Sequence, residues 1–232
     1  MGLLNSIRRW IGVQTRFRRH EDAYTLDREA LWVALQSAIE RQRQLQHSVW
    51  LVVHFPSTFE QVQDQLEAWG LPYEVITDSI AGTDWAVSEL RKPGSIHLIL
   101  SSLIPLPSDG LDPIIQEGAT SVMVLERHPW LPIDEQVESF CRSCPFPLEY
   151  GMFLALDDPV LRDVVNETTV MILEQLGMGR HDLIASNMVS RRLTSYLKKR
   201  NQSIRESQTA DSPEQWLELH WYGGRDSSAS ED

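Results

Sequence analysis

The sequence predicts an α/β fold, in which one mostly parallel sheet carries helices on both faces and a helical segment follows at the C-terminal side. Short apolar runs of β-type residues alternate along the chain with segments whose apolar residues recur at helical spacing. Breaking residues such as Pro56, Gly70 and the pair Pro93-Gly94 separate the two kinds of segment. With 232 residues, the chain has room for one domain of moderate size and two tails.

Five segments are expected to form the strands of this sheet. The first, VWLVVHF (49–55), is apolar without interruption, as a parallel strand buried on both faces requires. The expected strands are 49–54, 73–77, 96–101, 121–126 and 150–155. Ser57 and Glu60 follow the first strand at the spacing of a capping box, which predicts a helix start there.

The bulk composition limits the classes of function. A formal net charge of −12 repels phosphate backbones, so a nucleic acid is not expected as the partner. The sequence holds no apolar run of about 18 residues and no pattern of a secretory signal, which predicts a cytoplasmic protein. Cys141 and Cys144 form a lone CxxC without the further ligands of a zinc site, so neither a metal nor another cofactor is expected.

The segment 1–22 is basic, and its apolar residues recur at helical spacing, which predicts a short amphipathic helix. Two interpretations remain open. The helix could contact a partner or, weakly, an anionic membrane, which would place the protein peripherally on the inner face of that membrane. Alternatively, it could pack on its own domain. The candidate contact residues are Arg8, Arg9, Trp10, Ile11, Arg16, Phe17, Arg18 and Arg19.

The segment 201–232 is acidic and polar, and it is expected to be a flexible tail. It contains one apolar island, WLELHWY (216–222), whose aromatic side chains are costly to leave in water. The island could dock on its own domain or form a motif for a protein partner. The candidate motif residues are Trp216, Leu219, Trp221 and Tyr222.

Four segments follow, in order and at similar spacing, the pattern of one known family. They are VWLVVHFPSTFEQVQDQLEAWGLPYEVI (49–76), ERHPWLPIDEQV (126–137), LALDDPVLRDV (154–164) and ILEQLGMGRHDLIASNMVSRRLTSYLKK (172–199). Together they resemble the second nucleotide-binding domain of the SecA preprotein translocase ATPase family and the start of the helical region after it. The resemblance implies a RecA-like sheet, of the type found in P-loop NTPases. It also implies a domain over 23–200 whose C-terminal helices begin at about residue 158.

The chain departs from this family at the residues that hydrolyse ATP. The sequence contains no GxxxxGK[ST] motif, which holds the nucleotide phosphates. In the stretch that resembles the arginine-finger motif, QVESFCRS (136–143), the arginine positions hold Glu138, Phe140 and Ser143. The glycine-rich ATP loop of the family corresponds to SSLIPLPSD (101–109), in which prolines lack the N–H that would bind an anion.

These departures predict a degenerate, non-catalytic version of the domain. It would act by protein–protein contact in protein translocation, with translocase components as candidate partners. Two alternatives remain: a half-motor that completes an ATP site with another chain, and a peripheral membrane adaptor.

The end of the fourth expected strand is the best candidate for a remnant ligand site, because ligands of open α/β sheets gather at the carboxyl ends of strands. The residues in question are Glu126, Arg127, His128, Asp134 and Gln136. They could still contact a nucleotide or another anion. Alternatively, Arg127 and His128 could form an ion pair or hydrogen bond with Asp134 that holds the following loop.

Overall fold

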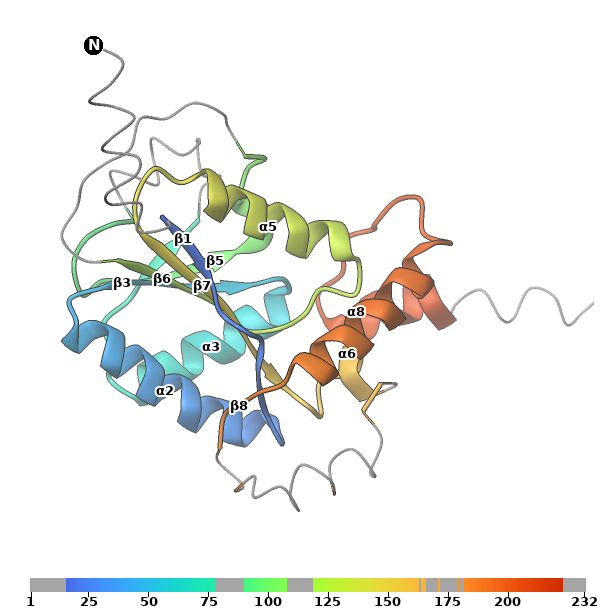
Figure 1. Ribbon diagram of the computed structural model, residues 1–232, viewed down its shortest axis with the longest axis horizontal. Coiled ribbons are helices and arrows are strands. Elements are labelled where there is room, and N and C mark those ends of the chain that lie inside the picture. Colours follow the sequence, from blue (N-terminus) through green and yellow to red (C-terminus); the bar gives the residue numbers. More distant parts are fainter. Residues whose placement is uncertain are drawn as a thin grey trace, which may run out of the picture.

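Eight strands of the described residues form the sheet at the centre of the fold (Figure 1). The structure is a computed structural model that describes residues 16–77, 90–107, 119–162, 164–165, 171, 179 and 182–222. Of residue 222 it describes the backbone alone. The strands are β1 (Phe17–Arg19), β2 (Ala23–Thr25), β3 (Ser48–Val53), β4 (Glu74–Ile76), β5 (Ile96–Leu100), β6 (Thr120–Val124), β7 (Leu148–Ala155) and β8 (Ile184–Ala185). Their order is β4-β5-β3-β6-β7-β2-β8, with β1 also paired to β7.

Every strand pair is parallel except β2 with β8. All five expected strands are present as β3 to β7. In β3, Trp50 and Val52 point into one buried cluster while Val49, Leu51 and Val53 point into another. Both faces of this strand are therefore buried, which explains its unbroken apolar sequence.

The helices lie in layers on the two faces of the sheet (Figure 1). α2 (Arg28–Gln44) and α3 (Pro56–Ala68) cover one face, and Gly70, with a φ of 64°, follows the end of α3. On the other face lie α5 (Leu131–Ser143), α6 (Pro159–Arg162), α8 (Asn187–Asn201) and α9 (Pro213–Leu217). Two short turns complete the described elements, η1 (Ser101–Leu103) and the π-helical η2 (Glu218–Tyr222). The predicted α/β class, with its C-terminal helical segment, is confirmed.

The described end of the N-terminal segment is a strand, and not the end of an amphipathic helix. β1 runs parallel to the first residues of β7, and the Leu148 N–H donates to the Arg16 carbonyl at 2.6 Å. The Phe17 ring lies 6.0 Å from the Tyr150 ring, and the Arg142 guanidinium lies 4.4 Å from the centre of the Phe17 ring. The free edge of β7 offers backbone partners that an isolated short helix lacks, which explains the difference.

This strand also changes what the basic residues can do. Arg19 donates to Asp22 at 2.8 Å and to Glu138 at 3.1 Å, so its positive charge is paired with carboxylates of the same domain. Arg16 and Arg18 are exposed. The other candidate contact residues of this segment lie outside the described part of the chain: Arg8, Arg9, Trp10 and Ile11.

The tail was expected to be flexible, but residues 201–222 fold back onto the domain. Trp216 is completely buried, and Leu217 and Trp221 are nearly so, all within the cluster that also contains α5 and α8 side chains. Burial of the Trp216 and Trp221 indoles offsets the conformational entropy lost when this short segment becomes ordered. The polar composition of the segment alone does not reveal this gain. Leu219 remains 49% exposed.

Candidate functional site

The carboxyl ends of β3 and β6 meet at a cluster of buried polar residues. His54 directly follows β3, Glu126 to His128 directly follow β6, and Asp134 lies in the first turn of α5. All of them are at most 7% exposed. Because β3 and β6 are parallel neighbours, their ends bring residues about 70 positions apart into contact. Four of the five predicted remnant-site residues therefore lie together.

The Glu126 carboxylate binds the N-terminus of α3. One oxygen accepts from the backbone N–H groups of His54 at 2.7 Å and Phe55 at 3.0 Å, and the other accepts from the Thr58 hydroxyl at 2.6 Å. The expected capping box is not formed, since Phe55 is the N-cap residue and no side chain of the helix itself caps it. A helix N-terminus in this position attracts anions, and here a carboxylate of the protein fills it.

Asp134 is the shared acceptor of the cluster. Its Oδ1 accepts from the backbone N–H of His128 at 3.2 Å and lies 2.9 Å from Nε2 of His54, whose Nδ1 is 2.9 Å from the Ser101 hydroxyl. Its Oδ2 lies 3.4 Å from Nε of Arg127. Burial alone would raise the pKa of Asp134, but Arg127 and then His54 lower it below its usual value. Asp134 thus contacts both residues of the loop after β6, Arg127 through its side chain and His128 through its backbone.

His128 lies among aromatic rings. It stacks on Phe55 with ring centres 5.1 Å apart, and Trp216 from the tail meets it edge-on at 5.5 Å. Its Nδ1 accepts from the backbone N–H of Trp130 at 2.9 Å, which places the proton of the neutral ring on Nε2. Burial, followed by repulsion from His54, lowers the pKa of His128 to about 3.

Gln136, the fifth predicted residue, has a different contact. Its side-chain amide donates to the carbonyl of Ile104 at 2.7 Å. Ile104 follows η1 in the loop that corresponds to the glycine-rich loop of the resembled family, after the carboxyl end of β5. Gln136 thus joins α5 to this loop.

The three positions that correspond to arginine fingers are occupied by groups with contacts inside the domain. Phe140 is completely buried in the core. Glu138 accepts from Arg19 and from Arg142, the latter across one turn of α5. The Ser143 hydroxyl donates to the Phe140 carbonyl at 2.7 Å.

The folded tail covers this edge of the sheet. The backbone N–H of Ser57, in the first turn of α3, donates to the Asp211 carbonyl at 2.9 Å. The backbone N–H of Leu131, in the first turn of α5, donates to the Asn201 side chain at 2.8 Å. One backbone N–H at the start of each of these two helices is therefore satisfied by the segment from α8 to α9, and Trp216 packs against His128.

Sequence reasoning did not find the partners of this cluster. His54 is buried at the end of an apolar strand, and its link to Asp134 has no local signal in the sequence. The same holds for Thr58 and for Asp158, which binds Arg28 at 2.6 Å from 130 positions away. Burial raises the pKa of Asp158 to about 7, although Arg28 opposes the change.

Within the described residues, no group of three or more His, Cys, Asp or Glu side chains is placed to hold a metal ion. The two cysteines of the CxxC pair, Cys141 and Cys144, are buried and form no disulfide bond. None of the helices in the described ranges is long and apolar enough to cross a membrane.

The chain is similar in part to curated SecA proteins. It is 33% identical to the protein translocase subunit SecA of Dichelobacter nodosus over 88 residues, 38% of this chain. It is also 33% identical to the protein translocase subunit SecA 1 of Rhodopirellula baltica over 98 residues, 40% of this chain. The matched stretches span only 10% and 8% of those relatives. No model of a protein family matches the chain.

Among solved structures, the chain matches the C-terminal domain of a possible DNA helicase from Lactobacillus plantarum WCFS1. The identity is 16% and the TM-score 0.38, and the match covers 63% of this chain and 80% of the other. A likeness this weak carries no argument about function.

Proposed function

We propose that this chain is a non-catalytic SecA-like domain that acts in protein translocation by binding another protein. The partial similarity to two SecA subunits supports the link to translocation. One observation carries the non-catalytic part: the positions of the arginine fingers hold the buried Phe140 and the ion-paired Glu138. An arginine finger contributes a factor of about 10³–10⁵ to phosphoryl transfer, so its replacement removes useful turnover.

The filled edge of the sheet supports the same proposal. Glu126 occupies the N-terminus of α3, where a phosphate would otherwise bind, and its charge repels a nucleotide. The tail adds Trp216 and the Asp211 carbonyl over the same edge. A nucleotide would have to displace a folded segment and compete with an internal carboxylate.

The first test measures turnover and nucleotide affinity of the purified full chain. With ATP and Mg²⁺, phosphate release is expected to stay at background, far below about 0.1 s⁻¹, which is already slow for an enzyme. Isothermal titration with ADP is expected to show no saturable binding. Turnover that disappears in an Arg127→Gln variant whose circular dichroism spectrum shows it to be folded, but persists in the exposed-site control Arg142→Gln, would contradict the non-catalytic proposal.

The second test addresses the partner. SecA purified from the same cell is passed over the immobilised full chain, and an unrelated acidic domain of equal net charge serves as the control surface. Saturable binding to the chain alone is the expected result. Equal signals on both surfaces, or no signal on either, would contradict the proposal that the translocase is the partner.

A further inference from the structure

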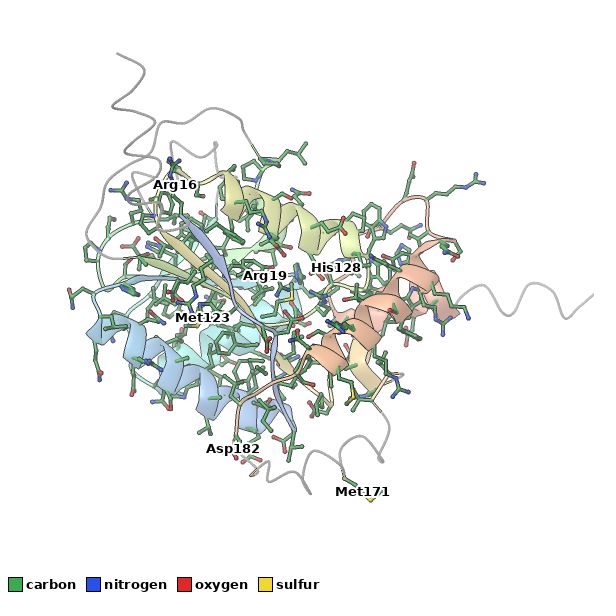
Figure 2. All side chains as sticks on the ribbon, viewed as in Figure 1. Arg16, Arg19, Met123, His128, Met171 and Asp182 are labelled. Atoms are coloured by element: carbon green, nitrogen blue, oxygen red, sulfur yellow. The ribbon has the colours of Figure 1, made fainter. Side chains whose placement is uncertain are left out.

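A cavity of about 490 Å³ opens beside Arg127, between the β1–β2 connection and α8. Three arginines line it: Arg19 from β1, Arg127 from the loop after β6, and Arg191 from α8. Ser190, Thr194 and Ser195 line the α8 side. Figure 2 shows Arg19 and His128 on the face of the sheet that carries α5 and α8. The volume lies in the usual range of small-ligand sites.

Arg127 is a buried cation with few good partners. Its side chain is 7% exposed, and Nε makes no hydrogen bond in the described structure. One terminal nitrogen donates to the thioether of Met152, a weak acceptor, and the other lies 3.4 Å from the Thr194 hydroxyl. Burial alone would lower the pKa of Arg127, but Asp134 and then Asp22 raise it, so the charge is kept. A charged donor this poorly satisfied is costly unless a further acceptor binds it.

The acidic residues of the cavity are already engaged. Asp22 is bound by Arg19, and Glu21 accepts from the side-chain amide of Asn187. Asp134, which pairs with Arg127 but does not line the cavity, is shared with His54 and the backbone of His128. Arg191, by contrast, has no ion-pair partner among the described residues. Arg191 is thus a cavity cation without an ion pair in the described part of the chain. Arg127 is paired with Asp134 through Nε alone, at 3.4 Å, and its two terminal nitrogens have only weak acceptors among the described residues.

We propose that this cavity binds a small ligand through an oxyanion group, a phosphate or a carboxylate, held between Arg127 and Arg191. Guanidinium groups suit both anions because they donate in a planar fork. The hydroxyl of Thr194 supplies a further donor, and Asn187, the first residue of α8, brings the positive end of the helix dipole to the cavity wall. This site is separate from the filled edge at Glu126, and it does not depend on the proposed function.

Thermal unfolding of the full chain tests the proposal, with inorganic phosphate and malonate as probes at constant ionic strength. A saturable rise of the melting temperature by roughly 2–4 °C at about ten times Kd is expected with at least one probe. The probe that binds distinguishes a phosphate ligand from a carboxylate. The Nε–H resonance of Arg127 in an ¹⁵N spectrum is expected to shift along the same titration curve.

Arg191→Ala is the principal variant, because Arg127 also neutralises Asp134 and its loss could prevent folding. It is expected to weaken the probe's Kd by about tenfold or more, as the loss of a charged hydrogen bond does. Thr194→Val is expected to weaken it less. Arg192→Ala is the matched control, since the adjacent Arg192 lines a separate small apolar cavity with Val165 and Val189. Equal Kd values for the Arg191 and Arg192 variants, or no saturable shift with either probe, would overturn the proposal.

Discussion

The side chain of Asn201, the last residue of α8, clamps the loop between β6 and α5. Its Oδ1 accepts from the Leu131 backbone N–H at 2.8 Å, and its Nδ2 donates to the Pro129 carbonyl at 2.8 Å. Leu131 is the first residue of α5, so its N–H has no partner within that helix. A residue 70 positions away therefore caps α5 and attaches the C-terminal helices to the polar cluster.

Asn201→Ala is expected to lower the free energy of unfolding by about 1–3 kcal/mol, because it leaves the Leu131 N–H without its acceptor. Urea denaturation measures the change. The adjacent, exposed Gln202→Ala serves as the control and is expected to remain within about 0.5 kcal/mol of the parent. Equal stabilities for the two variants would show that water or another group replaces the clamp.

Trp216→Ala is expected to cost about 3–5 kcal/mol, the range for removing a large aromatic side chain from a core. Trp216 is fully buried, its indole N–H donates to the Ser207 hydroxyl at 2.9 Å, and its ring contacts His128. Leu219→Ala, in the same segment but half exposed, is expected to cost less than about 1 kcal/mol. If the two substitutions destabilise the protein equally in urea, the tail is not part of the core.

The central strands could be predicted from the sequence because their two buried faces require unbroken apolar runs, as in β3. The short strands β1 and β2 could not. β1 is Phe-Arg-Arg and β2 is Ala-Tyr-Thr, and both are strands because β7 offers a free edge and not because of their own composition. Local pattern carries no information about such an edge.

The candidate site also has a part that the sequence predicts and a part that it does not. Arg127, His128 and Asp134 lie within eight residues of one another, so their spacing and the family resemblance indicated a cluster. His54 and Trp216 join it from other parts of the chain, through the parallel pairing of β3 with β6 and through the folding of the tail. Contacts over this sequence distance depend on tertiary packing, which a single sequence does not encode locally.

Cys141 and Cys144 are expected to react slowly with iodoacetamide in the native protein at pH 8. Burial raises the pKa of Cys144 to about 12 and that of Cys141 well above its ordinary value. Since the thiolate is the reactive form, both should be alkylated more than about a hundredfold more slowly than a free cysteine. Mass spectrometry measures the rates, and the urea-unfolded chain provides the control. Fast alkylation of either thiol in the native state would instead support a redox function.

Two buried groups are expected to give the stability opposite dependences on pH. The pKa of His128 is about 3 in the folded state and about 6.5 in an unfolded chain. Its contribution is therefore present above about pH 6.5 and is lost as the pH falls toward 3. The pKa of Asp158 is raised to about 7, so its contribution is present below about pH 4 and is lost as the pH rises through 7.

Single substitutions separate these two dependences. Each group changes the slope of unfolding free energy against pH by at most about 1.4 kcal/mol per unit, and between pH 4.5 and 6 the two slopes largely cancel. His128→Phe is expected to make stability fall as the pH rises through this window, because the effect of Asp158 on the slope is then no longer cancelled by that of His128. Asp158→Asn is expected to make stability rise with pH, and the exposed Asp157→Asn is the control, with a slope like that of the parent. Urea denaturation at four pH values measures the slopes. A parental slope in the His128 variant would mean that His128 titrates in the folded protein as it does in the unfolded chain, and that its burial beneath Trp216 does not keep it neutral.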